Sequence, residues 1–344
     1  MTLFKNKKFL IFLICLLLFD LVFFLWFFAA QTKKSIWPEK DLLFGLTYSQ
    51  KQAETLGLDW QKVYLAVLDD LGARRLRLAA YWDEIEKAEG QYDWQRLDWL
   101  IDQAGQREAE IILAVGGRLP RWPECHWPSW AADVSEAERE KKILAYLEAS
   151  IRRYQDRKNI LAWQVENEPF LSSYFGECPP LRVEFLDQEI ALVKRLDARP
   201  VVVTDSGELS FWLPAARRAD IFGTTMYRDT YSSHFKRYIH YPLTPAFFRL
   251  KKLFVSWLAK PSEWIVIELQ AEPWASAAYQ QLSAAERART MDMEKFRSTL
   301  EFARQTGFQK FYLWGAEYWY WERTVNGNDD FWNYAKNLFD TKNF

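Results

Sequence analysis

Strand-like runs and helix-like segments alternate along the chain from about residue 43 to its end. Eight short runs rich in aliphatic and aromatic residues have the length of strands: 43–48, 75–81, 110–115, 160–165, 200–204, 220–226, 264–267 and 311–315. Eight segments with helical periodicity follow them in turn: 59–71, 94–104, 135–154, 181–196, 211–218, 241–258, 284–305 and 330–339. This alternation predicts an α/β fold in which eight parallel strands close into a (β/α)8 TIM barrel.

The length of the chain fits a single barrel of this kind. It has 344 residues and is 49% hydrophobic, enough for a large core without help from disulfides. No internal repeat or second domain boundary is visible. We therefore predict one catalytic domain over residues 41–344, preceded by a linker over 31–40.

Residues 9–30 form a separate apolar segment in which Asp20 is the one charged residue. A helix of about 20 apolar residues spans a bilayer. Lysines at positions 5, 7 and 8 favour a cytoplasmic N-terminus over residues 1–8. We predict a transmembrane signal anchor at 9–30 with the catalytic domain on the extracytoplasmic side. A cleaved signal peptide is the alternative, and Phe28-Ala29-Ala30 is a poor cleavage site.

Polar and aromatic residues collect where the predicted strands end. The active site of a (β/α)8 barrel lies at the C-terminal ends of its strands. Glu168 and Glu268, one hundred residues apart, each follow an apolar run. Two carboxyl groups facing each other are what glycoside hydrolysis requires. The other strand ends supply Arg77, Trp82, Arg118, Asn167, Tyr227 and Trp314.

This set of strand-end residues resembles glycoside hydrolase clan A, chiefly its cellulase-like family 5. The likeness rests on Asn-Glu-Pro at 167–169, Glu268, Arg77, Tyr227 and Trp314. The region 77–104, with Trp82 and the run 90–94, is also similar to the family 42 and family 35 β-galactosidases. The resemblance covers about residues 43–320. One departure is the end of strand three, where many clan A enzymes place a His and this chain has Gly116-Gly117-Arg118.

The resemblance implies a role for each of these residues. Glu168 would be the general acid/base and Glu268 the nucleophile of a retaining glycosidase acting on a β-linked oligo- or polysaccharide. Substrate-binding roles would fall to Asn167 on the sugar 2-hydroxyl, Arg77 and Tyr227 beside the nucleophile, Trp314 beneath the sugar, and Trp82. No cofactor or metal is called for.

Electrostatics supports the same division of roles independently. Retaining hydrolysis needs two carboxyl groups about 5–5.5 Å apart, with one protonated at rest. The positive charge of Arg77 would keep Glu268 ionised, whereas poor solvation and a nearby carboxylate would keep Glu168 protonated.

Several alternatives remain open at the level of sequence. Glu166 competes with Glu168, because on an ideal strand both would face the same way. Glu272 competes with Glu268 but is expected in the following loop, and Glu317 could contact sugar or be an ordinary loop acid. A transglycosylase in envelope glycan remodelling would share every residue named. A catalytically inactive glycan-binding barrel would not need both acids.

Composition narrows the function classes further. Residues 1–34 carry five Lys and one Asp, so the remainder of the chain is mildly acidic and gives no support to nucleic-acid binding. Three His lack the spacing of metal sites. Aromatic residues make up 17% of the chain, which suits sugar stacking or a large core. We also predict a disulfide between Cys125 and Cys178, since they follow adjacent strands of an exported domain.

Overall fold

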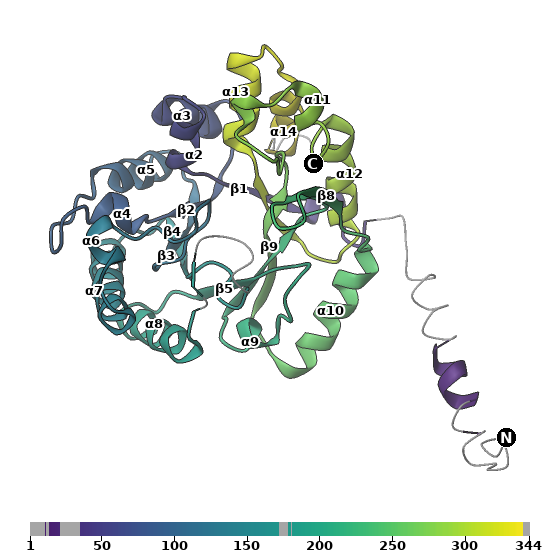
Figure 1. Cartoon of the computed structure of the whole chain (residues 1–344), viewed down its shortest axis with the longest axis horizontal. Coiled ribbons are helices and arrows are strands. Elements are labelled where there is room, and N and C mark those ends of the chain that lie inside the picture. The colour runs from purple at the N-terminus through teal and green to yellow at the C-terminus, as the bar shows by residue number, and fades with distance from the viewer. Residues whose placement is uncertain (1–10, 12–13, 21–34, 172–177, 180, 340–344) are drawn as a thin grey trace.

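Eight parallel strands form one closed barrel in the order β1-β10-β9-β6-β5-β4-β3-β2 (Figure 1). The computed structural model describes residues 11, 14–20, 35–171, 178–179 and 181–339. The predicted (β/α)8 fold is confirmed. The barrel strands are β1 (Leu43–Thr47), β2 (Arg75–Ala79), β3 (Glu110–Val115), β4 (Ile160–Val165), β5 (Val201–Asp205), β6 (Ile221–Met226), β9 (Glu263–Gln270) and β10 (Lys310–Trp314).

The helices form an outer ring around this barrel (Figure 1). Their apolar faces pack on the outer surface of the strands, because a parallel sheet must be covered on that side. The long helices are α3 (Trp60–Asp69), α5 (Gln95–Gly105), α7 (Glu136–Tyr154), α8 (Val183–Leu196), α10 (Pro245–Leu258), α12 (Met293–Arg304), α13 (Ala316–Val325) and α14 (Asp330–Phe339). Shorter elements are η2 (Glu39–Asp41), α2 (Gln50–Thr55), α4 (Trp82–Ile85), α6 (Ser129–Ala132), α9 (Leu213–Ala216), η3 (Tyr279–Gln281) and α11 (Ala284–Arg287).

The single helix predicted over 284–305 is wrong, because the chain forms α11 and then α12 with a break between them. Each helix has its own N-terminal cap. Ser283 forms a capping box with Glu286, and the Asp292 side chain accepts from the backbone N–H of Lys295. Two strong capping residues nine positions apart start two helices rather than one.

The elements that were not predicted from the sequence include a β-hairpin and helix α13. A β-hairpin of β7 (Asp229–Ser232) and β8 (Arg237–His240) follows β6, so the helix expected to begin at Tyr241 begins instead at Pro245. Helix α13 follows β10 almost at once and ends at Val325, with Asn326 as its C-cap just before Gly327, which has a φ of 68°. Both elements lie at the end of the barrel where the strands finish.

The inside of the barrel changes from apolar to polar along its axis. The part farther from the C-terminal ends of the strands is filled by a small apolar cluster: Ile112, Ala162, Val202, Ile265, Ile267 and Tyr312. Gly45 allows this filling, because a Cβ there would lie 2.8 Å from the Tyr312 ring. The part near the C-terminal ends of the strands holds buried polar side chains instead, including Thr47, Arg77, Gln164 and Glu268. Buried polar groups at one end of a packed barrel mark where its chemistry takes place.

The predicted membrane segment at 9–30 lies largely outside the described residues. Of that span the structure describes residues 11 and 14–20, which are helical and exposed. No helix in the described part of the chain is both long and apolar enough to cross a bilayer. The chain reaches the barrel at Ile36 and Trp37, whose backbone and ring N–H groups donate to the carbonyl oxygens of Arg304 (3.3 Å) and Gly307 (3.2 Å).

Candidate active site

Arg77 lies at the centre of the barrel mouth and joins three strand ends. Its side chain is fully buried. Nε donates to Gln164 Oε1 at 2.7 Å, Nη1 to Glu268 Oε1 at 2.7 Å, and Nη2 to Asn167 Oδ1 at 2.6 Å. A buried guanidinium requires such partners, because an unpaired charge taken out of water costs several kcal/mol. Arg77 on β2 therefore fixes polar groups of β4 and β9 relative to one another.

Glu268 is held by two donors. Its Oε1 accepts from Arg77, and its Oε2 accepts from the Tyr227 hydroxyl at 2.9 Å. Burial and the charge of Glu268 raise the pKa of Tyr227 well above its usual range, so this hydroxyl keeps its proton and donates it. These two hydrogen bonds fix the orientation of the Glu268 side chain.

Glu168 lies just beyond β4 in a different electrostatic setting. Its backbone N–H donates to Thr204 Oγ1 at 2.8 Å, and its Oε1 accepts from Thr225 Oγ1 at 3.2 Å. Burial first, and then the negative charges of Glu268, Glu124 and Asp205, raise the pKa of Glu168 well above its usual range. Burial and these neighbouring negative charges therefore favour the protonated form of Glu168.

The structure brings Glu168 and Glu268 to a common space. Thr225 on β6, which bonds to Glu168, is the register partner of Glu268 on the neighbouring strand β9. Adjacent strands lie about 4.8 Å apart. Each carboxyl also raises the pKa of Tyr227, so both lie within electrostatic range of the same hydroxyl. Both predicted acids therefore lie at the barrel mouth, each with its own hydrogen-bond partners.

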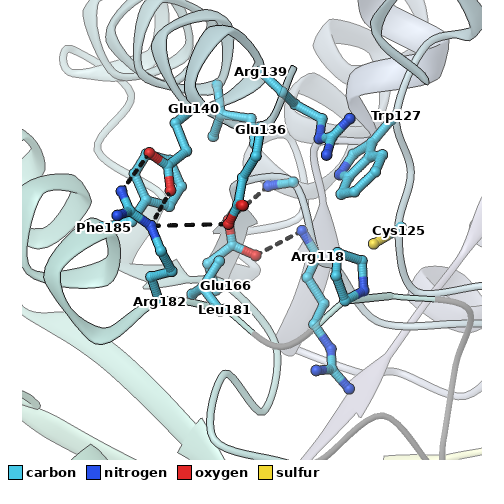
Figure 2. Close-up of a pocket in the computed structure, with 13 residues that line it drawn as sticks. Arg118, Cys125, Trp127, Glu136, Arg139, Glu140, Glu166, Leu181, Arg182 and Phe185 are labelled. Atoms are coloured by element: carbon cyan, nitrogen blue, oxygen red, sulfur yellow. Dashed lines mark hydrogen bonds and ion pairs between the residues drawn. The ribbon is translucent and has the colours of Figure 1, made fainter. Parts of the chain in front are cut away.

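Glu166 points away from this space, toward the helices outside the barrel. Its Oε1 and Oε2 accept from the backbone N–H groups of Gly117 (2.7 Å) and Arg118 (2.6 Å). Figure 2 shows Glu166 in a pocket of about 40 Å³ between the barrel and helices α7 and α8, where Arg182 pairs with Glu136 and Glu140. Glu166 supports the loop after β3 and has no access to the mouth.

Two left-handed residues separate the directions of Glu166 and Glu168. Their φ angles are 58° and 44°, so the alternation of an ideal strand ends at Val165. Non-glycine residues in this region cost about 1–3 kcal/mol each and tend to cluster at functional sites. A Cβ on Gly116 would lie 2.4 Å from the Glu166 carboxylate, so glycine is required there.

Asn167 and Gln164 complete the polar layer of β4. The Asn167 oxygen accepts from Arg77, which leaves its amide nitrogen free to donate elsewhere in the mouth. Gln164 had not been identified from the sequence, although it interrupts an otherwise apolar strand. Its side-chain nitrogen donates to the Glu166 carbonyl oxygen at 2.8 Å, which holds the turn between the two acids.

Trp314 is at the mouth, but an arginine from the loop after β3 covers one of its faces. The guanidinium of Arg121 lies 4.0 Å from the ring centroid. Arg121 also pairs with Glu272 and, at 2.8 Å, with Glu317. Both acids are thus occupied in a structural ion-pair network. Burial raises the pKa of Glu317 to about 7.

Glu272 does not reach Glu268's position, and β9 is longer than the sequence suggested. The strand continues to Gln270, two residues before Glu272. The extension is paired with β10, where Gln270 lies opposite Trp314, and the Gln270 side-chain oxygen accepts from the backbone N–H of Arg228 at 2.8 Å. Glu268 is therefore inside the barrel rim rather than in the loop beyond it.

The predicted substrate contact of Trp82 is wrong. Its side chain is fully buried on the outer side of β2, where it stacks against Tyr146 and donates from Nε1 to Glu86 at 2.6 Å. The residue lies on the first turn of α4, and that turn directs it into the core between helices. Local sequence similarity alone does not predict the direction in which the Trp82 side chain points.

The loop after β3 covers part of the mouth. Arg118 pairs with Glu124 at 2.6 Å, and burial raises the pKa of Glu124 to about 7. Cys125 at the end of this loop and Cys178 form a disulfide, with sulfur atoms 2.12 Å apart. The bond links the loop after β3 to the loop after β4, on which Glu168 lies.

No known protein-family model matches the chain. β-Galactosidase BgaA of Clostridium cellulovorans is 26% identical over 201 residues, which are 52% of this chain and 30% of BgaA. The solved structure of GH5_18 from Bifidobacterium longum has a TM-score of 0.56 and 11% identity, and the match covers 80% of this chain and 69% of that protein. Gan42B, a GH42 β-galactosidase, gives a TM-score of 0.56 and 13% identity over 87% of this chain and 56% of Gan42B.

These similarities confirm the fold-level resemblance to glycoside hydrolase families 5 and 42 that the strand-end motifs indicated. The resemblance to family 35 stays a prediction. The chain spans 30% of the length of BgaA and 56% of the length of Gan42B.

Proposed function

We propose that this protein is a retaining glycosidase that hydrolyses a β-linked glycan. The observation that carries the proposal is the pair at the barrel mouth. Glu268 accepts hydrogen bonds from Arg77 and Tyr227, and burial raises the pKa of Glu168 at the same mouth. A charged nucleophile and a protonated acid at one barrel mouth are the two parts of a double displacement.

In the first step Glu268 attacks the anomeric carbon of the sugar while Glu168 gives its proton to the glycosidic oxygen. The carbon–oxygen bond to the leaving group breaks, and a covalent glycosyl ester forms on Glu268. Glu168, now a carboxylate, then takes a proton from water, which attacks the same carbon and releases Glu268. Two displacements at one carbon retain the anomeric configuration.

The neighbouring residues have supporting roles in this proposal. Asn167 would donate from its amide nitrogen to the 2-hydroxyl, since its oxygen already accepts from Arg77. Arg77 and Tyr227 would hold the Glu268 carboxylate in line with the anomeric carbon. Trp314 would present to the sugar whichever part of its ring Arg121 leaves uncovered.

A β-linked substrate is proposed from the similar proteins. BgaA and Gan42B are described as β-galactosidases, and both resemble this chain in sequence or fold. The identity of the sugar would depend on the loops at the mouth, among them the loop after β3, where this chain departs from the clan A pattern with Gly116-Gly117-Arg118.

The membrane anchor at residues 9–30 is part of the same proposal, and the catalytic domain would lie on the extracytoplasmic side. The support is the apolar composition of the segment and the lysines before it. Digestion of intact cells by added protease tests the orientation. Cleavage of the barrel's exposed loops is the expected result, and full protection until the cells are lysed would contradict it.

The test of the activity is a panel of aryl α- and β-glycosides incubated with the purified full chain. Proton NMR of the first product formed reports its anomeric configuration. The proposal expects hydrolysis of at least one β-glycoside with the β-anomer appearing first. Initial release of the α-anomer would reject the double displacement.

A further inference from the structure

We propose that a cavity beside Glu168 binds the leaving group of the substrate, and that this leaving group carries an alkyl or aryl portion. The inference rests on the proposed function, which it deepens by naming the class of leaving group. The cavity has a volume of about 800 Å³. Ligand pockets in proteins usually have volumes of about 300–1,000 Å³, so this cavity is large enough for a group of that kind.

The walls of the cavity come from the loops after three consecutive strands. Phe170 and Leu171 follow Glu168 at the end of β4, Leu209 and Phe211 lie after β5, and Phe235 lies in the β7–β8 hairpin. Arg77, Glu168, Glu268 and Trp314 are not among its lining residues, whereas Phe170 and Leu171, which follow Glu168 in the chain, are. The cavity is therefore on the side of the acid and away from the nucleophile.

The reaction geometry makes that side the leaving-group side. The acid must reach the glycosidic oxygen, whereas the nucleophile attacks the anomeric carbon from the opposite face. Two lining residues are electrostatically close to the acid, since Asp205 affects the pKa of Glu168 and Glu168 affects that of Tyr241. A leaving group that has received its proton from Glu168 would thus enter this cavity.

The cavity is polar near Glu168 and apolar farther out. Asp205 and Thr230 are buried at its inner end, where they can meet hydroxyl groups next to the bond that breaks. The outer walls expose Leu209, Phe211 and Phe235 to fractions of 50%, 63% and 60%. Large apolar side chains that converge on one opening mark a contact site for an apolar partner. A leaving group that is polar next to the glycosidic bond and apolar farther away would match both the inner end and the outer walls of the cavity.

The test compares methyl and octyl β-glycosides of one sugar, which is chosen as a sugar that the full chain hydrolyses as its aryl glycoside. All octyl glycoside concentrations stay below micelle formation. The parent enzyme is expected to show a kcat/KM at least about tenfold higher for the octyl compound, through a lower KM, because each methylene in an apolar pocket adds binding energy.

The variant F211A/F235A is expected to lose that preference while it hydrolyses the methyl glycoside at the parent rate. The matched control is F254A, because Phe254 on α10 is 62% exposed and does not line the cavity. Equal kcat/KM values for the two glycosides in the parent, or an unchanged preference in F211A/F235A, would overturn the inference and leave the glycosidase assignment intact. Failure to hydrolyse any aryl glycoside would reject the proposed function, and the inference with it.

Discussion

Glu166 and Glu168 leave the same strand two residues apart, yet they end in opposite environments. Glu168 faces the barrel mouth, next to Glu268 and a cavity of about 800 Å³. Glu166 faces a pocket of about 40 Å³ under the helices, next to the buried carboxyl of Glu189. Glu168 interacts with Glu268, and Glu166 interacts with Glu189. Burial and the neighbouring charge raise the pKa of Glu168 in the first pair and of Glu189 in the second.

The two pairs of acids differ in their hydrogen-bond partners and in whether a ligand can reach them. The mouth pair has Arg77 and Tyr227 on one acid and open space beside the other. The outer pair binds two backbone N–H groups and is sealed by α7 and α8. A raised pKa alone therefore does not identify a catalytic acid, because structural acid pairs show it too. The following changes test this distinction.

The largest effect is expected from Glu268→Gln. Loss of the nucleophile should lower kcat by at least about a thousandfold on aryl β-glycosides, since the remaining groups cannot replace a covalent step. The measurement is steady-state kinetics, with circular dichroism to verify the fold. Glu166→Gln is the comparison variant, and equal losses in the two variants would contradict the separation of the two pairs.

Glu168→Ala should lower kcat about 10²–10⁴-fold on substrates with poor leaving groups, because general acid catalysis contributes about this much. Added azide should restore turnover of aryl substrates by attacking the glycosyl-enzyme without needing a base. In the parent, activity should fall as pH rises through the raised pKa of Glu168, and this alkaline limb should be absent from the variant. An unchanged limb would assign the acid role elsewhere.

Glu166→Gln should cost about 1–3 kcal/mol of unfolding free energy, because an amide cannot accept from both Gly117 and Arg118 N–H groups. Urea denaturation measures this loss. The kcat at a temperature where the variant is folded should stay within a few-fold of the parent. A loss of kcat as large as that of Glu168→Ala would show that the two positions share one function.

The smallest effect is expected from Glu189→Gln at neutral pH. Burial and the charge of Glu166 raise the pKa of Glu189 well above its ordinary 4.5, which favours the neutral acid in the folded state, and Gln is a close neutral replacement for it. Its contribution to stability is present below pH 4.5 and is lost as pH rises through the folded-state pKa. The parent should therefore lose stability toward alkaline pH more steeply than the variant in urea titrations, and parallel profiles would contradict this assignment.

Sequence patterns predicted the barrel well because its strands are buried on both faces and its helices are amphipathic. They failed where direction depends on one or two backbone angles. Alternation along β4 placed Glu166 and Glu168 on one side, whereas two left-handed residues turn them apart. Trp82 was misplaced because a short helix rotates it into the core. Arg121 over Trp314 could not be foreseen, since it joins a loop after β3 to the end of β10.

The measurement that tests the account most directly is covalent trapping with an aryl 2-deoxy-2-fluoro-β-glycoside of a sugar that the enzyme hydrolyses. The fluorine slows the second displacement more than the first when the leaving group is good, so the glycosyl-enzyme accumulates. Mass spectrometry of a peptide digest should find one sugar adduct on Glu268. An adduct on Glu166, Glu168 or Glu272, or turnover with no adduct, would contradict the proposed mechanism.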